Sequence, residues 1–288
     1  MGEIEMMDQM TLLEKLDRVA GVCRRLGLAG LPPAGKNLLK PLFGNRLSVR
    51  VEGFAITASL EHRHYLQALR RGKIESLMAR LFGSVIHPGM VVLDIGAFVG
   101  WYTLLAARQV GAQGKVYAFE PDPRNFDLLG ENLRLNRVDS RVICLPRAVS
   151  DEAGVQPFFL HGGDQSRSSL IPSGGGHEST TATTVVLDDF FDRGIKIDVV
   201  KMDIEGGEVH ALRGMAETLA RAGRSVKLFV ECNPNSLRFA GESSQSLIAE
   251  LRQLDFTIFL IDEANRGLKR VDSRVETAKY VNLYCLRE

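Results

Sequence analysis

Three acids and a lysine lie close together in the segment VVKMDIEGGE, which starts at Val199 and ends at Glu208. A strand is expected at Ile197–Met202, so Lys201 lies within it, and Asp203 and Glu205 follow it. A carboxylate near a reacting hydroxyl can accept its proton, and a neighbouring lysine can fix or neutralise that carboxylate. Asp203 is therefore our first candidate for a base or orienting group, Glu205 the second, and Lys201 their partner.

A second group of residues predicts a nucleotide-type pocket. In VVLDIGAFVG an apolar strand is closed by Asp94, and Gly96 and Gly100 form the turn into a helix. Glycine lets a backbone approach a ligand closely because it has no Cβ, and a helix N-terminus adds unpaired N–H groups. Such a turn is typical of the carboxyl end of a strand in a doubly wound sheet.

Glu120 ends the next expected strand, Lys115–Phe119. A carboxylate at this place can accept hydrogen bonds from both hydroxyls of a ribose. The strand before Asp203 is expected beside the strand that Asp94 closes, and the crevice between two such strands is where ligands bind. We therefore expect the acids near Asp203 to face the reactive end of the ligand.

Regular alternation from residue 89 onward predicts a parallel, doubly wound α/β sheet. The expected strands are Met90–Leu93, Lys115–Phe119, Arg141–Leu145, Ile197–Met202, Val226–Val230, Phe256–Ile261 and Lys279–Leu286. The expected helices are Trp101–Val110, Arg124–Asn136, Val209–Ala222 and Ser244–Leu254. Two more strands, Val155–Leu160 and Thr184–Leu187, flank a Gly/Ser-rich segment, and long segments of this kind are usually functional or mobile.

The N-terminal part differs from the rest. Residues 1–45 predict an amphipathic helix followed by a Gly/Pro break, residues 46–60 a strand or hairpin, and residues 61–82 a helical pattern. We assign 1–72 to an N-terminal helical/β extension and 73–288 to the main domain. The extension is expected to cap that domain, with a dimer arm or a membrane-surface contact as alternatives, so a homo-oligomer through this extension is a further expectation.

Composition excludes several classes of protein. The 288 residues carry a net charge of +1, which argues against a strongly basic nucleic-acid binder, so we expect no nucleic-acid partner. Four scattered cysteines without a CxxC pair indicate a reduced, cytoplasmic protein. The sequence has no run of about 18 apolar residues, so no transmembrane segment is expected.

The motifs VVLDIGAFVGWYTLLAA, YAFEPDPRNFDLLGENLRLN, RAVSDEAG, LDDF and VVKMDIEGGEVHALRGM together resemble the FkbM-type S-adenosylmethionine-dependent methyltransferases. The resemblance covers roughly residues 73–288. It implies the class I methyltransferase (Rossmann-like) fold, a seven-stranded sheet with an antiparallel last strand that the two C-terminal strands supply. It also implies S-adenosyl-L-methionine as cofactor.

The resemblance further implies which residues hold this cofactor. One position departs from the family pattern, because Phe98 stands where the family usually has asparagine, and its ring could pack near the sulfonium. The implied roles are a turn under the methionine part for Asp94, Gly96, Ala97, Phe98 and Gly100, a place behind that turn for Thr103, ribose binding for Glu120, and an approach to the adenine for Ala148 and Val149.

The function that this resemblance implies is O-methylation of a hydroxyl on a small-molecule or saccharide acceptor, such as a sugar, glycolipid or secondary metabolite. A Mg²⁺ held by Asp203 and Glu231 is an alternative, but we expect no metal because the ligands are too few. A nicotinamide-dependent oxidoreductase is disfavoured by the missing third glycine of GxGxxG. The other alternative is a catalytically degenerate S-adenosylmethionine-binding module, for which Phe98 is the warning sign.

Overall fold

A computed structural model describes residues 46–161, 168–172, 178–271 and 280–287. The chain divides into two compact units, Met1–Ile74 and Glu75–Glu288, and each is described by itself. The amphipathic helix and the Gly/Pro break expected in residues 1–45 lie outside the described residues.

The first unit contains the expected hairpin. Strand β1 (Arg46–Val51) pairs antiparallel with β2 (Phe54–Ser59) over its whole length. The turn residues Glu52 and Gly53 have φ of 49° and 87°, and two positive φ values fit a two-residue turn that follows the twist of the strands. A short 3-10 turn then leads into α3 (Arg63–Arg70), which packs on the hairpin.

The helical pattern expected over residues 61–82 is two helices rather than one. Helix α3 ends at Arg70, and α4 (Ser76–Val85) belongs to the second unit. Gly72 and Glu75 have φ of 60° and 43°, and left-handed residues cannot continue a right-handed helix. The apolar spacing alone therefore did not reveal that these two left-handed residues interrupt the helix.

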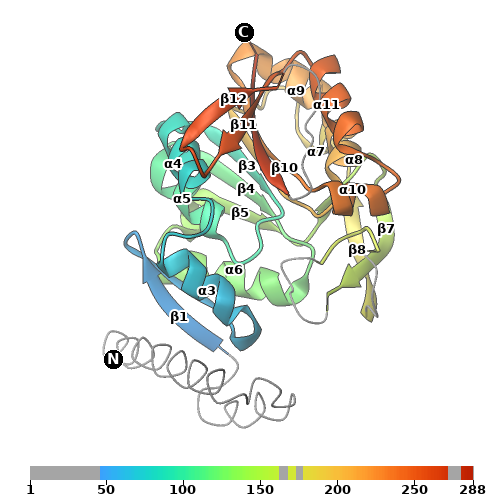
Figure 1. Cartoon of the computed structure of the whole chain (residues 1–288). Coiled ribbons are helices and arrows are strands. Elements are labelled where there is room, and N and C mark those ends of the chain that lie inside the picture. Colours follow the sequence, from blue (N-terminus) through green and yellow to red (C-terminus); the bar gives the residue numbers. More distant parts are fainter. Residues whose placement is uncertain (1–45, 162–167, 173–177, 272–279, 288) are drawn as a thin grey trace. The chain divides into compact units, whose positions relative to one another are not determined.

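The second unit is built on a large, mostly parallel sheet (Figure 1). Among the described residues this sheet has eight strands in the order β12-β11-β13-β10-β9-β3-β4-β5. They are β3 (Val91–Ile95), β4 (Lys115–Phe119), β5 (Val142–Leu145), β9 (Val199–Met202), β10 (Lys227–Cys232), β11 (Thr257–Asp262), β12 (Gly267–Arg270) and β13 (Val281–Leu286).

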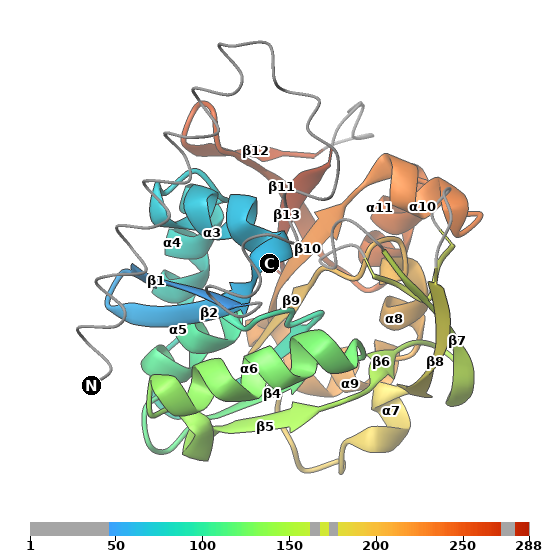
Figure 2. The same cartoon turned by 90° about the horizontal axis from the view of Figure 1, so that it is seen from below.

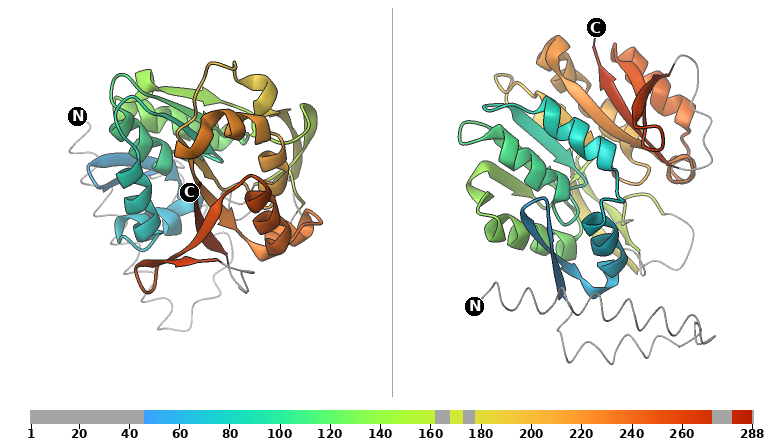
Figure 3. Two further views of the ribbon diagram at one scale, coloured as in Figure 1. Left: turned by 90° about the horizontal axis from the view of Figure 1, so that it is seen from above. Right: turned by 60° about the vertical axis from the view of Figure 1, so that its left-hand side comes forward.

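The order of these strands confirms the predicted class I methyltransferase fold. Strands β5, β4, β3, β9 and β10 are parallel neighbours, while β13 lies antiparallel between β10 and β11. The antiparallel strands form one end of the sheet, in orange to red, and β5 forms the other (Figure 3). Strand β12 is an additional edge strand that the sequence did not predict, because its residues are mostly exposed and have no apolar alternation.

Helices cover both faces of the sheet (Figures 1 and 2). One face carries α4, α5 (Trp101–Val110) and α6 (Pro123–Leu135). The other carries α7 (Leu187–Phe190), α8 (Glu208–Arg213), α9 (Ala216–Ala222) and α11 (Ser244–Gln253), whose apolar side chains join one buried cluster with the sheet. Helix α10 (Pro234–Phe239) follows β10, and its N-cap Asn233 accepts hydrogen bonds from the first N–H groups.

A small second sheet lies between β5 and α7 in the chain. It has the order β6-β8-β7, with β6 (Ala148–Val149), β7 (Gly154–Leu160) and β8 (Glu178–Val185). The strand expected at Val155–Leu160 is confirmed. The strand expected at Thr184–Leu187 starts and ends earlier, because Leu187 already belongs to α7.

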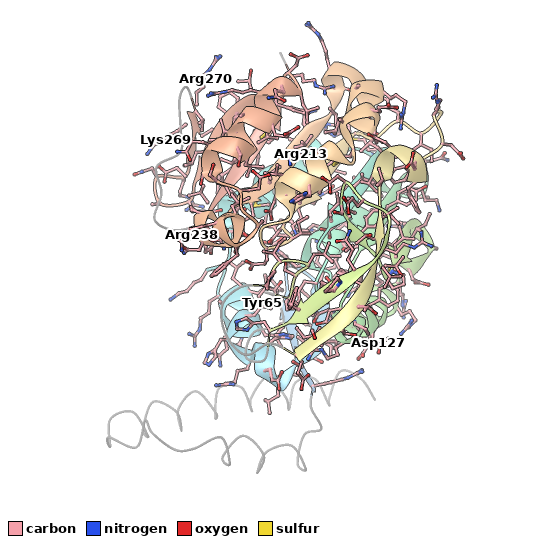
Figure 4. All side chains as sticks on the ribbon, turned by 90° about the vertical axis from the view of Figure 1, so that its right-hand side faces the viewer. Tyr65, Asp127, Arg213, Arg238, Lys269 and Arg270 are labelled. Atoms are coloured by element: carbon pink, nitrogen blue, oxygen red, sulfur yellow. The ribbon has the colours of Figure 1, made fainter. Side chains whose placement is uncertain are left out.

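The helix expected at Val209–Ala222 is broken at Gly214. A Cβ built on Gly214 would overlap the carbonyl group of Ser150, so only glycine fits where these two segments meet. The preceding residue, Arg213, forms ion pairs with Glu242, which precedes α11, and with Glu250 on α11 (Arg213 is labelled in Figure 4). The close approach at Gly214 ties α8 and α9 to the end of β6.

In the described part of the chain, no helix combines the length and apolar character that crossing a membrane requires.

Replacing Gly214 by alanine should destabilise the second unit. The added methyl group overlaps backbone atoms that cannot move independently, and overpacking of this kind costs about 1–3 kcal/mol. Urea unfolding of the full chain measures the change. Gly194→Ala is the matched control, because no atom lies within 4 Å of a Cβ there and its φ is not positive. Equal stability of the two variants would contradict the packing at Gly214.

Candidate active site

The candidate site lies at the carboxyl ends of four adjacent parallel strands. Strand β9 pairs with β3 on one side and β10 on the other, and β4 lies beside β3. The acids near these strand ends therefore come together at one edge, as the sequence predicts for Asp94, Glu120 and Asp203. In the sheet register Lys201 stands directly opposite Asp94.

Lys201 is the centre of this group. Its side chain is 4% exposed, and its Nζ donates to the carbonyl oxygen of Gly96 at 2.9 Å. The same nitrogen lies 3.6 Å from Asp94 Oδ1 and 3.7 Å from Asp203 Oδ2. Burial by itself would lower the pKa of Lys201, but the carboxylates around it, Asp203 and Asp94 foremost, raise the pKa above its usual value. Lys201 therefore stays charged and holds two carboxylates in place.

Asp94 is fully buried within β3 rather than following the strand as the sequence suggested. Thr103 Oγ1 donates to Asp94 Oδ2 at 2.6 Å, which ties the first turn of α5 to the strand. Burial raises the pKa of Asp94, while Lys201 and Thr103 oppose the rise. Asp94 and Thr103 thus hold the turn from behind.

The Gly96–Gly100 turn is fixed by packing within the protein. A Cβ on Gly96, whose φ is 80°, would overlap the backbone carbonyl of Asp203. A Cβ on Gly100, whose φ is 96°, would lie 2.7 Å from Leu129 Cδ1. Close approach to a ligand, the reason we gave from the sequence, is therefore not needed to explain the two glycines.

Phe98 lies within this turn with a φ of 52°, a left-handed conformation that asparagine adopts more readily than phenylalanine. Its backbone N–H donates to Glu120 Oε2 at 2.7 Å. The asparagine usual in the family thus fits the backbone observed here. Ala97, between Gly96 and Phe98, is buried, and its N–H donates to the carbonyl of Phe119.

Glu120 comes directly after β4 and is 5% exposed. Besides Phe98, the N–H of Asp122 donates to its Oε1 at 3.0 Å. Burial raises the pKa of Glu120 to about 7, against the lowering effect of these two N–H donors. The Asn125 side chain is a third donor to this carboxylate, and because each carboxylate oxygen can accept more than one hydrogen bond, Glu120 can still accept from a ribose hydroxyl.

Ala148 and Val149 form β6, beside β8 in the small sheet. Their side chains are 6% and 2% exposed, and Val149 belongs to the main buried cluster.

Three acids lie close together at this edge of the sheet, and one of them, Asp203, pairs with Lys201. One carboxylate oxygen each of Asp203, Glu205 and Glu231 lies within 4.8 Å of the others. Glu205 has a φ of 54°, and its Oε2 accepts hydrogen bonds from Ser236 Oγ at 2.8 Å and Asn233 Nδ2 at 3.4 Å. Burial raises the pKa of Glu231 well above its usual range, and the charges of Asp203 and Glu205 raise it further.

Sequence reasoning missed Glu75. This residue precedes α4, and it accepts hydrogen bonds from Tyr102 Oη at 2.8 Å and Asn282 Nδ2 at 2.6 Å. Burial and the charge of Asp203 raise its pKa. Glu75 lies before the first motif, and nothing in the spacing of the motifs connects it to Asn282, more than two hundred residues later in the chain.

A further contact that the sequence does not show joins the candidate site to Ser169, which pairs with Phe159 of β7. Ser169 Oγ donates within 3.0 Å to the carbonyl oxygen of Ile204 and within 3.1 Å to that of Glu205. His210, on α8, pairs with Asp151 through Nδ1 at 3.0 Å.

A family model described as "Methyltransferase FkbM domain" matches residues 94–258. The chain belongs to the FkbM methyltransferase family. This confirms the resemblance found in the motifs, and the protein is an S-adenosylmethionine-dependent methyltransferase. Nothing in the comparisons supports a nicotinamide-dependent oxidoreductase.

Relatives carry the same region. Hexuronic acid methyltransferase AglP of Haloferax volcanii is 28% identical, over 59% of this chain and 68% of its own length. The 31-O-demethyl-FK506 methyltransferase FkbM of Streptomyces tacrolimicus is 31% identical, over 47% of this chain and 63% of its own length. Methyltransferase sdnD of Sordaria araneosa is 29% identical, over 44% and 60%. The matches thus span three fifths to about two thirds of these relatives.

The residues at this edge of the sheet fit S-adenosylmethionine. Carboxylates outnumber the lysine between them, which favours a cofactor that carries a positive sulfonium. Glu120 offers acceptor oxygens to the hydroxyls of a ribose, one strand away from Lys201.

Replacing Lys201 by methionine should destabilise the protein by about 3–5 kcal/mol, because it leaves Asp94 as a buried charge without its partner. Lys196→Met is the matched control. Lys196 pairs with Asp198 at 3.8 Å, but its side chain is 59% exposed, so its loss should cost less than about 1 kcal/mol. Chemical denaturation measures both changes, and similar losses in the two variants would show that the Lys201 pairs contribute little.

The pH dependence of cofactor binding should identify Glu120. Because we expect the ribose hydroxyls to donate to the ionised carboxylate, affinity for S-adenosylhomocysteine should be highest above about pH 7 and approach a tenfold loss per pH unit below it. Calorimetric titration between about pH 5.5 and pH 8 tests this, and Glu120→Gln should give a nearly flat and weaker profile. A variant that keeps the wild-type pH profile would contradict the placement of the ribose.

Without ligand, the stability of the folded state changes with pH in the opposite direction to the cofactor affinity. The pKa of Glu120 is raised from 4.5 to about 7, so folding favours the protonated acid. This contribution to stability is full below about pH 4.5 and is lost as the pH rises through about 7.

Proposed function

We propose that this protein methylates a hydroxyl group on a sugar, a sugar acid or another hydroxylated secondary metabolite, with Asp203 facing the acceptor. The observation that carries the proposal is a contrast in exposure. The side chain of Asp203 is 36% exposed, whereas those of its partners Lys201 and Asp94 are 4% and 0% exposed. Asp203 is therefore the member of this ion-pair group that an acceptor can reach.

The cofactor site in this proposal is the turn between β3 and α5 together with the end of β4. Gly96, Ala97, Phe98 and Gly100 pass under the methionine part, and Glu120 binds the ribose. Ala148 and Val149, which follow β5, approach the adenine. Asp94 and Thr103 hold the turn from behind through the hydrogen bond from Thr103 Oγ1 to Asp94 Oδ2.

The chemistry divides between cofactor and protein. When bound, S-adenosylmethionine supplies a methyl group on an electrophilic sulfonium. The protein aligns the acceptor oxygen with that methyl group, which is worth several kcal/mol. Asp203 orients the acceptor hydroxyl or accepts its proton. Lys201 fixes Asp203, and Glu205, held by Ser236 and Asn233, lines the same side.

The names of two relatives support an oxygen acceptor. One is named for hexuronic acid and the other for a 31-O-demethyl compound, and both terms describe oxygenated molecules. The acceptor in our proposal is accordingly a small molecule or saccharide and not a nucleic acid, in keeping with the net charge of +1.

We also propose a cytoplasmic location and a division at about residue 72 between the N-terminal extension and the methyltransferase domain. The three described cysteines are free thiols, which supports a reducing compartment. The N-terminal extension is the element through which a homo-oligomer would form.

Asp203→Asn should lower turnover by roughly 10²–10⁴, because the amide cannot take a proton and no longer attracts Lys201. Binding of S-adenosylhomocysteine should change only slightly, because Asp203 faces the acceptor. Formation of S-adenosylhomocysteine with a panel of sugars, sugar acids and polyketides measures turnover, and calorimetry measures binding.

Asp127→Asn is the matched control for this variant, since Asp127 is exposed on α6 (Figure 4). Parallel loss of binding and turnover in Asp203→Asn would instead place Asp203 in the cofactor site. Near-normal turnover would assign its function to Glu205.

A further inference from the structure

The three carboxylates of Asp203, Glu205 and Glu231 form a cluster that like charges alone would not hold together. Their oxygen atoms lie within 4.8 Å of one another, although they come from the end of β9, the turn after it and the neighbouring strand β10. Lys201 approaches this cluster through Asp203, but the same ammonium group is shared with Asp94. The ammonium group that pairs with Asp203 is thus divided between this cluster and Asp94.

Glu231 shows most clearly that a partner is missing. It is 7% exposed, and its Oε2 is buried without a hydrogen-bond partner. A buried carboxylate oxygen normally accepts at least one hydrogen bond, because desolvation without compensation is costly. Here the backbone position is fixed by β10, which pairs with β9 and β13 on both sides, so the side chain is held among the other acids.

Neighbouring side chains hold the second acid in a defined orientation. Ser236 Oγ and Asn233 Nδ2 both donate to Glu205 Oε2. Gly206, next to Glu205, has a φ of 106°, and a Cβ there would lie 2.5 Å from the carbonyl oxygen of Ser236. The turn that carries Glu205 is thus packed tightly against α10, and the carboxylate is pre-positioned.

The spacing of the oxygens fits a single cation. Two ligands of one ion are separated by at most twice the metal–oxygen distance, which is about 4.2 Å for Mg²⁺ and about 4.6–5.2 Å for Ca²⁺. Separations of up to 4.8 Å lie within this limit for Ca²⁺, whereas Mg²⁺ requires a small inward movement of the side chains. A set of carboxylates without sulfur or imidazole favours hard divalent cations of this kind.

We propose that Asp203, Glu205 and Glu231 bind a divalent cation of the Mg²⁺, Mn²⁺ or Ca²⁺ class, and that this cation holds the acceptor at the site of methyl transfer. The inference deepens the proposed function and rests on it for the identity of the reaction. It replaces our expectation, from the sequence, that no metal is involved. Asp203 then orients the acceptor through the cation.

The cation also selects a class of acceptor. Three carboxylate ligands leave about three positions of a six-coordinate ion, enough for two acceptor oxygens and a water. Acceptors with two adjacent oxygens, such as vicinal diols or α-hydroxy acids, are therefore preferred over isolated hydroxyls.

The reaction balances without a further reactant. The acceptor O–C bond forms as the S–C bond of the sulfonium breaks, and the electron pair of the broken bond remains on sulfur. The cation makes the hydroxyl more acidic, so its proton leaves to solvent water.

Binding of Mn²⁺ alone to the full-length protein tests the site, read from the loss of the electron paramagnetic resonance signal of free Mn²⁺. We expect one saturable site, with Mg²⁺ or Ca²⁺ in competition. Glu231→Gln should weaken binding by about tenfold or more, because it removes a charged ligand. Glu217→Gln, which alters a glutamate that is 73% exposed on α9, should bind Mn²⁺ as the wild type does.

A second readout is thermal unfolding. Mn²⁺ should raise the melting temperature of the wild type and of Glu217→Gln, and much less that of Glu231→Gln. If Glu231→Gln does not fold, Glu205→Gln provides the same test. Absence of saturable binding to the wild type, or unchanged binding in both Glu231→Gln and Glu205→Gln, overturns the proposal.

Parallel titration with S-adenosylhomocysteine separates this inference from the proposed function. Methyl transfer that continues in EDTA, with no Mn²⁺ bound, refutes the cation site and leaves the methyltransferase function intact. Bound Mn²⁺ without binding of S-adenosylhomocysteine keeps the cation site and refutes the proposed function. Activity that EDTA abolishes and Mg²⁺ restores supports both, and faster methylation of vicinal diols than of isolated hydroxyls supports the acceptor class.

Discussion

The buried ammonium group of Lys201 is the interaction on which the rest of the site depends. It lies between Asp94 and Asp203 and donates to the carbonyl of Gly96, so one charge joins two adjacent strands and the turn that follows the first of them. Thr103 extends the connection to α5 through Asp94. Because Lys201 and Asp94 are buried, removal of either leaves a charge that water cannot solvate. The catalytic edge and the centre of the sheet are therefore stabilised by the same contacts.

Much of the fold could be predicted from the sequence. Buried parallel strands are continuous apolar runs, so β3, β4 and the strand carrying Lys201 were recognisable, and the motifs after them indicated the family. The breaks at Gly72 and Gly214 were not recognisable as such. Each depends on backbone conformation or on a close contact with a distant residue, Ser150 in the case of Gly214, and hydrophobic spacing contains neither.

In the candidate site, too, some residues could be found from the sequence and others could not. Lys201, Asp203 and Glu120 could be found because each lies at the end of a strand or just inside one. Glu75 could not, because its partner Asn282 lies on the antiparallel strand β13 and only the folded sheet brings the two together. The need for glycine at position 96 was predicted correctly but for a different reason, since the nearby obstacle is the Asp203 backbone.

The hydrogen bonds of Ser169 determine which parts of the chain around the candidate site can vary in sequence. Its hydroxyl group contacts the main-chain carbonyls of Ile204 and Glu205 and no side chain of that turn. The segment that carries Ser169 can therefore vary in sequence around one hydroxyl without disturbing the acids beside it. The segment around Ser169, which pairs with Phe159 of β7, is in this sense free to vary, whereas β6 is not, because Val149 belongs to the main buried cluster and Ser150 packs against Gly214.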